Sequence, residues 1–502
     1  MASPYPSPPP QAGEGVTKRL SAAAWPALVL SGHARAYERA GLTSGIVHLG
    51  AGAFFRAHVA AYTDAVLASG DRRWGITGVS LRHPDVRAAL APQDGLYTLL
   101  ERDNDKVSAR AIGALTRVLA AAGERDVLQR ALCAPSVAVV TLTITEKAYG
   151  IGADGHLDVH APAIAADLQH PHAPASAVGW LAATLVARRQ AHVPPYAVLA
   201  CDNLRDNGRT LRRLVLAYAQ RTFPHEASWI ADAVAFPNTM VDRIVPRTTA
   251  QDRLDARAAH GYVDELPVRC EPFTQWVIED FAGARPQWEI AGAQFVSDVR
   301  PFEDAKLRLL NAAHTAFACF GVLLGHATIA QASTDPDIAA FVRRLMTEEL
   351  APTLTCAPTL DPVAYQARLW PRFGNAALGH GTQQVAMDTS AKLAQRHVPV
   401  MLERRARGEG IECIAVVVAG WIRYLAGRDE SGSTYPIDDP LAAPLTELAT
   451  AWRTDPRACV ERFFALEAVF GELRNDKLAK DAVVRQLERI AANGVRAALR
   501  GT

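Results

Sequence analysis

The sequence lacks the features that mark several large classes of protein. Its seven cysteines are scattered and none forms a Cys-x-x-Cys pair, which argues against a disulfide framework or a structural zinc site and fits a reducing compartment. Its 53 basic and 52 acidic residues nearly cancel, so neither nucleic acid nor an anionic membrane is expected as a partner. The start, Met1 to Gln11, has no basic residue before an apolar run and does not resemble a secretory signal.

Long apolar runs are also missing. The most apolar stretch, Cys413–Ile422, has about half of the roughly 20 residues that a membrane-spanning helix needs, and we interpret it as a buried element. The chain has no Gly-x-Ser-x-Gly nucleophile motif, no Walker-type Gly-Lys-Ser/Thr loop, and no His-x-x-x-His or Glu-x-x-His metal set near residues 303–314. We therefore expect a soluble, cytoplasmic protein with no metal ion at its site.

What is present indicates two domains. Four short apolar runs predict buried parallel strands with helical patterns between them: Gly45–Gly50, Trp74–Ser80, Val137–Ile144 and Tyr196–Ala200. After about Pro301 the patterns are mostly helical: Ala305–Leu324, Pro336–Leu350, Pro362–Leu369, Ala391–Arg407, Cys413–Leu425, Pro440–Arg453 and Asp481–Leu499. We predict a tail and lead-in (residues 1–40), an α/β amino-terminal domain with a Rossmann-like doubly wound sheet (41–295), and an all-helical carboxy-terminal domain (296–502).

A glycine turn follows the first predicted strand and opens a helical run. Gly50, Gly52, Ala53 and Phe54 are candidate cofactor-binding residues, because bare backbone amides at such a turn let the pyrophosphate of a dinucleotide approach. Phe55 stands where the usual fingerprint has its third glycine. A plain tight turn is the alternative interpretation.

The second predicted strand ends in Ser80-Leu81-Arg82-His83 without the acidic residue that usually binds the ribose hydroxyls. Arg82 is a candidate partner for the 2′-phosphate of NADP, or else a solvated loop residue. The choice between NAD and NADP stays open at this point.

Two further segments carry candidate polar contacts. Asn203 follows the fourth strand, where ligands bind in open parallel sheets, although the Asx residues there would also suit a helix cap. Asp242 and Arg243 lie between two prolines in an apolar segment. Asp242 is either a substrate contact or half of a buried salt bridge that holds a loop.

One helical segment combines the residues of an acid–base site. Glu303, Lys306, Asn311 and His314 fall on one half of a regular α-helix, which turns about 100° per residue, and that half is otherwise apolar. Burial lowers the pKa of a lysine, so Lys306 is suited to take a proton from an alcohol. Asn311 and His314 are placed to hydrogen-bond the oxygen that gains charge.

Taken together, these segments resemble the mannitol dehydrogenase family of polyol-specific long-chain dehydrogenases. The matching stretches are Gly50–His58, Gln93–Tyr97, Thr141–Tyr149, Cys201–Gly208, Phe236–Pro246, Glu271–Asp280, Lys306–Gly321, Arg372–Asn375 and Ala386–Lys392. They cover most of the chain, and their combination is far more specific than any one motif.

The resemblance implies hydride transfer without zinc, with NAD favoured over NADP. It implies that Lys306 is the general acid/base, that Asn203 and Asn311 stabilise the developing alkoxide, and that His314 positions the substrate. The expected function is the interconversion of a polyol and its ketose, with D-mannitol and D-fructose first and fructuronate reduction to D-mannonate second.

The remaining candidate residues surround this set. The resemblance implies that Asp242 contacts the substrate or its neighbours, that Glu303 relays the proton, and that Glu146 lines the site. A uronate substrate needs a cation for its carboxylate, and Arg372 and Lys392 are candidates that are equally suited to structural roles. A nucleotide-binding sensor or scaffold without catalysis is the alternative of a different class. Monomer and weak homodimer both stay open.

Overall fold

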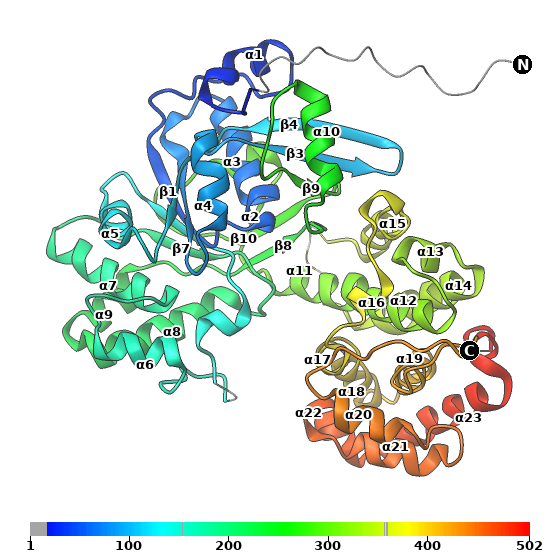
Figure 1. The fold of residues 1–502 in the computed structure, drawn as a ribbon. Coiled ribbons are helices and arrows are strands. Elements are labelled where there is room, and N and C mark those ends of the chain that lie inside the picture. The colour runs from blue at the N-terminus through cyan, green and yellow to red at the C-terminus, as the bar shows by residue number, and fades with distance from the viewer. Residues whose placement is uncertain (1–17, 153, 356, 358–359, 502) are drawn as a thin grey trace, which may run out of the picture. The chain divides into compact units, whose positions relative to one another are not determined.

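The computed structural model describes residues 18–152, 154–355, 357 and 360–501, apart from the side chains of Glu146 and Lys147. These residues form two compact units, and neither is continuous in sequence (Figure 1). The first unit contains the chain up to Glu101 and the ranges Val107–Cys270 and Asp280–Phe295. The second contains Arg102–Lys106, Glu271–Glu279 and the chain from Val296 onwards.

The first unit is built on a five-stranded parallel sheet in the order β5-β2-β1-β6-β7. Its strands are β1 Ser44–Leu49, β2 Gly75–Ser80, β5 Leu115–Ala120, β6 Val139–Leu142 and β7 Ala197–Ala200. The four predicted strands are confirmed. The fifth, β5, was not predicted, because the exposed Arg117 interrupts its mostly buried run.

The strand order fixes where a ligand would bind. From β1 the chain adds β2 and β5 on one side, and then β6 and β7 on the other. The order therefore reverses between β1 and β6, and open α/β sheets bind ligands in the crevice outside the carboxyl ends of the strands at such a point. A second sheet in this region has the order β4-β3-β9, from β3 Tyr97–Asp103, β4 Lys106–Ile112 and β9 Val268–Cys270.

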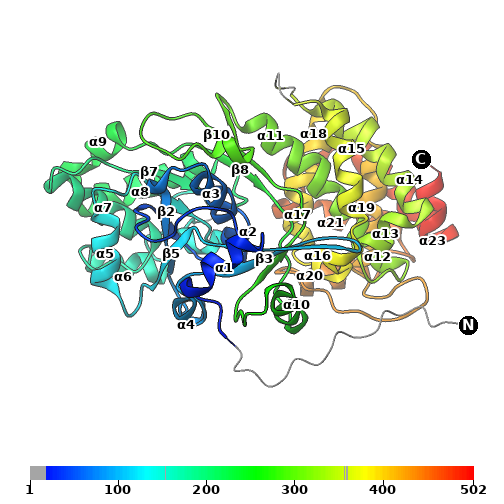
Figure 2. The ribbon, with the colours of Figure 1, turned by 90° about the horizontal axis from the view of Figure 1, so that it is seen from above.

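Helices complete the first unit, and α5 to α9 gather on one side of it in both views (Figures 1 and 2). The helices are α1 Trp25–Leu30, α2 Ala53–Ala57, α3 Val59–Ala68, α4 Asp85–Leu90, α5 Arg125–Cys133, α6 Pro162–Gln169, α7 Ala177–Gln190, α8 Asn207–Thr222, α9 Pro224–Ala233 and α10 Ala250–His260. Buried side chains of β1, β6, β7, α7 and α8 share one hydrophobic core. Short strands β8 Thr239–Asp242, β10 Gln275–Glu279 and β11 Gln294–Val296 occur later in the chain.

The second unit is helix-rich, as predicted. Its elements are α11 Arg300–Ala305, η6 Lys306–Asn311, α12 Ala312–Leu323, α13 Ile329–Thr334, α14 Pro336–Arg344, η7 Leu345–Leu350, α15 Pro362–Phe373, α16 Thr382–Val385, α17 Thr389–Arg396, α18 Val398–Ala406, α19 Glu412–Tyr424, α20 Ala442–Ala449, α21 Pro456–Phe464, α22 Glu467–Phe470 and α23 Lys477–Arg500. Every residue of α12 is buried, and α19 packs against both α12 and α23.

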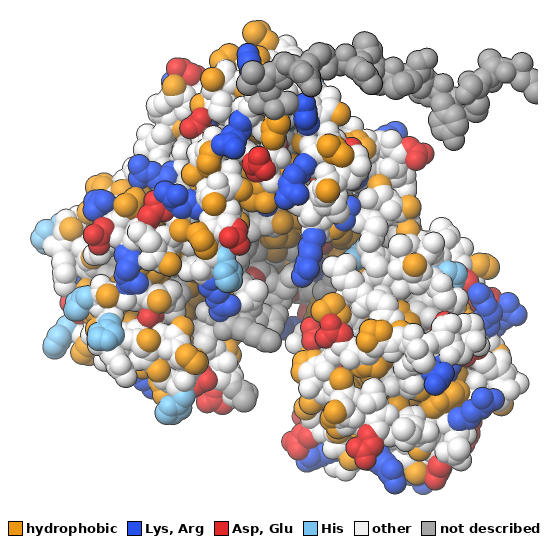
Figure 3. Space-filling view, in the orientation of Figure 1, with side chains coloured by type: hydrophobic (Ala, Val, Ile, Leu, Met, Phe, Trp, Pro, Cys, Tyr) orange, Lys and Arg blue, Asp and Glu red, His pale blue; other side chains and the backbone are white. Residues whose placement is uncertain are grey.

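The surface carries charges of both signs, and the most apolar run of the sequence is buried. On the face drawn in Figure 3, Lys and Arg side chains are interspersed with Asp and Glu side chains over both units. All residues from Cys413 to Tyr424 are buried, which confirms that this apolar run is a buried element. Among the described residues, none of the helices combines the length and the apolar character that crossing a membrane requires.

Candidate active site

The glycine turn after β1 has two glycines with different roles. Gly50 has a φ of 102°, which L side chains rarely adopt, and a Cβ there would lie 2.3 Å from the carbonyl oxygen of Thr143. A Cβ on Gly52 would meet nothing closer than 3.8 Å, so the turn borders open space where α2 begins. Gly50 therefore shapes the turn, while Gly52 leaves room for a group to approach its backbone. These residues fit the pyrophosphate of a dinucleotide.

Phe55 stands where the usual fingerprint has its third glycine, and its ring stacks on a neighbouring ring. It is fully buried, and its ring lies 3.7 Å from that of His48, centroid to centroid, at 13°. His48 is fixed in turn by hydrogen bonds with the hydroxyls of Thr141 (2.7 Å) and Thr143 (2.9 Å). The predicted helical run after the glycine turn is present but is divided into α2 and α3, because the backbone of His58 leaves the helical region.

A pocket of about 430 Å³ lies at the carboxyl ends of β2 and β5 and includes Ser80, Arg82 and His83 in its wall. Its acidic residue, Glu124, is held by Arg87 through two hydrogen bonds of 2.6 and 2.8 Å. Arg82 is exposed and has no hydrogen bond or ion pair within the described residues. Both interpretations of Arg82 thus remain, and its contact with a 2′-phosphate stays a prediction.

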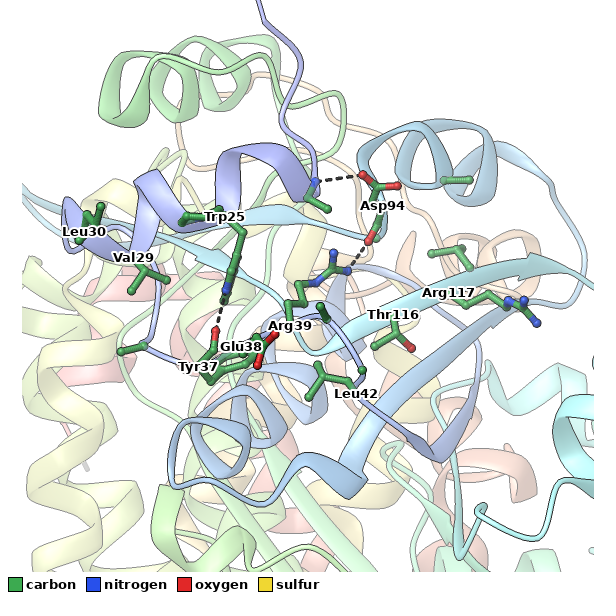
Figure 4. Close-up of a pocket in the computed structure, with 18 residues that line it drawn as sticks. Trp25, Val29, Leu30, Tyr37, Glu38, Arg39, Leu42, Asp94, Thr116 and Arg117 are labelled. Atoms are coloured by element: carbon green, nitrogen blue, oxygen red, sulfur yellow. Dashed lines mark hydrogen bonds between the residues drawn. The ribbon is translucent and has the colours of Figure 1, made fainter.

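Another pocket of the first unit does not suit the cofactor. It measures about 980 Å³ and includes Trp25, Val29 and Leu42 among its mostly apolar lining residues. Figure 4 shows the Trp25 indole donating to the Tyr37 carbonyl, at 2.9 Å. The pocket borders the amino ends of β1 and β5, whereas parallel sheets bind ligands at the carboxyl ends.

Asn203 lies exposed in the loop after β7, at a carboxyl end of the sheet. The helix-cap interpretation of this loop is not supported, because Asp206 occupies the cap position of α8 without a side-chain cap bond. The structural role belongs to Asn207, whose amide donates to the carbonyls of Ala200 (3.0 Å) and Thr239 (2.9 Å). The predicted contact of Asn203 with the substrate oxygen stays a prediction.

Asp242 ends β8 and is only 4% exposed. Its neighbour Arg243 forms a salt bridge with Glu101 and donates to the Ala57 carbonyl at 2.6 Å. A partly buried salt bridge thus holds this segment through Glu101, a partner that the sequence did not indicate. The substrate contact of Asp242 stays a prediction.

The helix that carries Lys306 is not a regular α-helix. Residues Lys306–Asn311 form η6, a π-helical turn between α11 and α12. A π turn holds one residue more than an α turn, so residues after it lag by about 100° round the axis. The regular spacing assumed from the sequence is therefore wrong beyond Lys306, and the lag turns His314 further toward the direction of Lys306. Wide turns of this kind are frequent at functional sites.

His314 is 7% exposed and lies edge-on to two rings, those of Phe373 (5.0 Å) and His380 (5.5 Å). Its Nε2 atom is buried and has no hydrogen-bond partner within the part of the chain that the structure describes. Burial, with the nearby His380, Arg372 and Arg396, holds the pKa of His314 well below its usual value, although a hydrogen bond to the Leu310 backbone opposes this. His314 is thus a neutral imidazole with an uncommitted nitrogen, as a ligand contact requires.

The two cations proposed for a uronate differ in their surroundings. Arg372 makes a buried bidentate pair with Glu271, with hydrogen bonds of 2.9 and 2.8 Å, and lies over the Phe273 ring. The Lys392 ammonium donates to the carbonyls of Val385 (2.9 Å) and Met387 (2.5 Å), and burial together with Arg396 lowers its pKa to about 8. Arg372 is therefore committed to Glu271, whereas Lys392 contacts only neutral groups.

Several residues of the site escaped the sequence analysis. Glu271 lay in a matched stretch, but no spacing linked it to Arg372. His380 and Arg396 lie near His314 only because α12, α16 and α17 pack together. Glu146 belongs to η4 (Glu146–Tyr149), and its side chain lies outside the described residues. No group of three potential metal ligands occurs among the described residues.

Comparison with known proteins identifies the architecture. The family model for the mannitol dehydrogenase Rossmann domain matches residues 44–290, and the model for the mannitol dehydrogenase C-terminal domain matches residues 298–491. The chain belongs to the mannitol dehydrogenase family. It is thus an oxidoreductase that uses a nicotinamide dinucleotide, and its fold is the predicted combination of a Rossmann-like sheet and a helix-rich domain.

Individual relatives span nearly the whole chain. D-mannonate oxidoreductase of Escherichia coli is 40% identical over 443 residues, covering 87% of this chain and 90% of the relative. Mannitol 2-dehydrogenase of Phaeosphaeria nodorum is 36% identical over 472 residues, covering 92% and 82%. The structure of Pseudomonas fluorescens mannitol 2-dehydrogenase in a ternary complex with NAD and D-mannitol has 38% identity and a TM-score of 0.81, covering 93% of this chain and 96% of that one.

Proposed function

We propose that this protein interconverts a secondary alcohol and a ketone on a sugar alcohol or a sugar acid, with Lys306 as the general acid/base. The observation that carries the proposal is the set of Lys306, Asn311 and His314 along η6 and α12, with an uncommitted buried nitrogen on His314. The family membership supports the same reaction class.

The proposed chemistry assigns each group one task. A bound nicotinamide dinucleotide supplies the hydride acceptor or donor. As the carbinol C–H bond breaks, neutral Lys306 takes the hydroxyl proton on Nζ, so that alcohol and oxidised cofactor become ketone, reduced cofactor and a proton. The amides of Asn203 and Asn311 donate to the oxygen as it gains negative charge, and the His314 imidazole binds a substrate hydroxyl. Glu303 passes the proton from Lys306 toward water, and Asp242 contacts the substrate.

Two substrates are candidates. D-mannitol ranks first from the sequence, and the relatives named mannitol 2-dehydrogenase support it. D-mannonate, the reduced partner of fructuronate, is supported by the relative named D-mannonate oxidoreductase. A specific observation favours this second candidate, because Arg396 acts on His314 and Lys392 on the neighbouring His380, and their positive charge would attract a carboxylate.

The test is the initial rate, followed by nicotinamide absorbance, on fructose, fructuronate, tagaturonate, xylulose and ribulose, each with NADH and with NADPH. Lys306→Ala should lower kcat by about two to four orders of magnitude, the range for a lost general acid/base. Lys480→Ala, which removes a lysine paired with Glu461 at the surface, is the matched control and should leave kcat unchanged.

Each outcome has a definite meaning. Unchanged kcat in Lys306→Ala would exclude Lys306 as the acid/base. A wild-type protein that binds NADH but turns over none of the sugars would support a nucleotide-binding sensor or scaffold instead of a dehydrogenase. The best substrate of the panel decides between polyol and sugar acid.

A further inference from the structure

His380 has a ring with uncommitted nitrogens beside the candidate catalytic helix. Its backbone carbonyl accepts a hydrogen bond from the amide of Ile329 at 2.9 Å, which fixes the loop before α16. Its half-buried ring lies 5.5 Å from the ring of His314 at an angle of 68°. Within the described residues, neither a hydrogen bond nor an ion pair involves the His380 ring. Two imidazoles thus meet here, each with a free nitrogen.

The charges around this pair are mostly positive. Lys392 lowers the pKa of His380, and Arg396 lowers the pKa of His314 and of Lys392. The Arg396 guanidinium donates only to neutral oxygens, the Asn311 carbonyl and the Thr315 hydroxyl, both at 2.9 Å. No carboxylate lies within salt-bridge distance of Arg396 in the described part of the chain. Arg372 is paired with Glu271, and Asp388 and Asp439 act on Lys392, so Arg396 is the cation without an acidic partner among the described residues. The surroundings therefore favour an anion over a neutral group.

We propose that His380 and His314 together bind the carboxylate of a sugar-acid substrate, with His380 as the substrate-positioning residue that selects acids over neutral sugars. The inference rests on the proposed function, because it assumes that Lys306 and His314 face the substrate. The His380 imidazole donates an N–H to the carboxylate, and His314, whose other ring nitrogen is hydrogen-bonded to the Leu310 backbone, donates from Nε2 once that nitrogen takes up a proton. The charges of Lys392 and Arg396 add attraction. A neutral sugar presents a hydroxyl at the same place and gains less from these charges.

The proposal has a pH signature. Burial lowers the pKa of both imidazoles, and Lys392 lowers that of His380 further, while Arg372 and Arg396 act on His314. A bound carboxylate favours the protonated rings, so binding takes up a proton. The KM for a sugar acid should therefore fall as pH decreases from 8 to 6. Above about pH 8 it should rise further, since Lys392, on which Asp388, Asp439 and Cys319 act against burial and Arg396, loses its charge there.

The experiment compares D-fructuronate with D-fructose for wild type, His380→Ala and His380→Gln. The alanine variant should raise the KM for fructuronate about tenfold or more, the effect expected for a lost hydrogen bond to a charged group. Its kcat and its KM for fructose should change by less than about threefold. The glutamine variant keeps an N–H donor and should recover part of the affinity without the pH dependence. His326→Ala removes another half-buried histidine of the same unit, one paired with Asp335, and should leave both KM values unchanged.

The outcomes separate this inference from the proposed function. An equal rise in KM for both sugars, or no rise for fructuronate, would overturn the role of His380 while turnover itself stands. Absence of turnover by wild type would count against the proposed function. In that case, calorimetric titration of D-mannonate and D-mannitol into the protein with saturating cofactor still decides the inference. Selective loss of mannonate affinity in His380→Ala with partial recovery in His380→Gln supports it, and a mannonate affinity in His380→Ala equal to that of the wild type refutes it.

Discussion

At the scale of single residues, the second unit places a buried ion pair directly beside a buried histidine. Arg372 and Glu271 are both almost completely buried, and their two hydrogen bonds satisfy the carboxylate. Removing one member of such a pair leaves the other charge without a partner in a region of low dielectric constant. The pair therefore supports the structural role that the sequence left open for Arg372, and a substrate contact of Arg372 stays a prediction.

Arg372→Ala should consequently lower the free energy of unfolding by about 3–5 kcal/mol, because Glu271 stays charged and buried. Chemical denaturation of the wild type and the variant at pH 7 measures the difference. Arg343 is the matched control, since its guanidinium also lies over an aromatic ring, Trp370, but is exposed and has no carboxylate partner among the described residues. Arg343→Ala should cost no more than about 1 kcal/mol. Equal costs for the two variants would contradict a special role for the buried pair.

At the scale of elements, two glycines of the turn after β1 have different roles: one is needed for the path of the backbone, and the other leaves space for the cofactor. Gly50 is required for the backbone to pass the Thr143 carbonyl, while Gly52 borders open space. Gly50→Ala should therefore destabilise the first unit and lose cofactor binding together. Gly52→Ala should keep the unfolding midpoint but weaken NADH binding at least about tenfold, because its new methyl group occupies the space that a pyrophosphate needs. Fluorescence titration with NADH, alongside thermal unfolding, checks both. Unchanged NADH affinity in Gly52→Ala would place the cofactor elsewhere.

Some strands and helical turns could be predicted from the sequence, and others could not. The strands β1, β2, β6 and β7 were predictable because buried, mostly apolar runs are typical of parallel strands covered on both faces. The edge strand β5 escaped because Arg117 interrupts its apolar run. The π turn over Lys306–Asn311 also escaped, since apolar periodicity over so few residues does not separate a π turn from an α turn. The sequence still identified Lys306, Asn311 and His314, because their residue types and their place on one helical segment do not depend on whether the turn is α or π.

Contacts between distant elements could not be derived in the same way. The bond of Arg372 to Glu271 joins residues 101 positions apart, and the contact of His314 with His380 depends on how helices pack. No periodicity or spacing encodes such pairs. The partners of a candidate residue, and hence whether it is committed or free, come from the tertiary structure alone.

At the scale of the whole molecule, each unit contains a fully buried histidine that acid should destabilise. Burial lowers the pKa of His48 in the first unit and of His397 in the second from 6.5 to about 3. Since the unfolded chain binds a proton at each histidine below pH 6.5 and the folded chain does not, stability falls as pH drops through this window and levels off near pH 3. Each histidine should contribute a slope of about 1.4 kcal/mol per pH unit.

Denaturant unfolding between pH 5 and 7, followed by hydrogen exchange so that each unit is observed separately, measures these slopes. His48→Asn should flatten the pH dependence of the first unit only, and His397→Asn that of the second only, so each variant is the control for the other. A slope that persists in the mutated unit would assign the acid sensitivity to other groups.

The discontinuous second unit has a consequence for how such a protein can be rearranged. Asn375 donates to the Arg102 carbonyl at 2.8 Å and accepts from the amide of Asn104 at 3.0 Å, and Glu271 comes from the same earlier part of the chain. A gene fusion that joins the last two hundred residues to a different dinucleotide-binding domain would leave these partners behind. The two units therefore cannot be exchanged as modules at a single junction, and recombination between relatives should succeed only where the short segments 102–106 and 271–279 travel with the helical half.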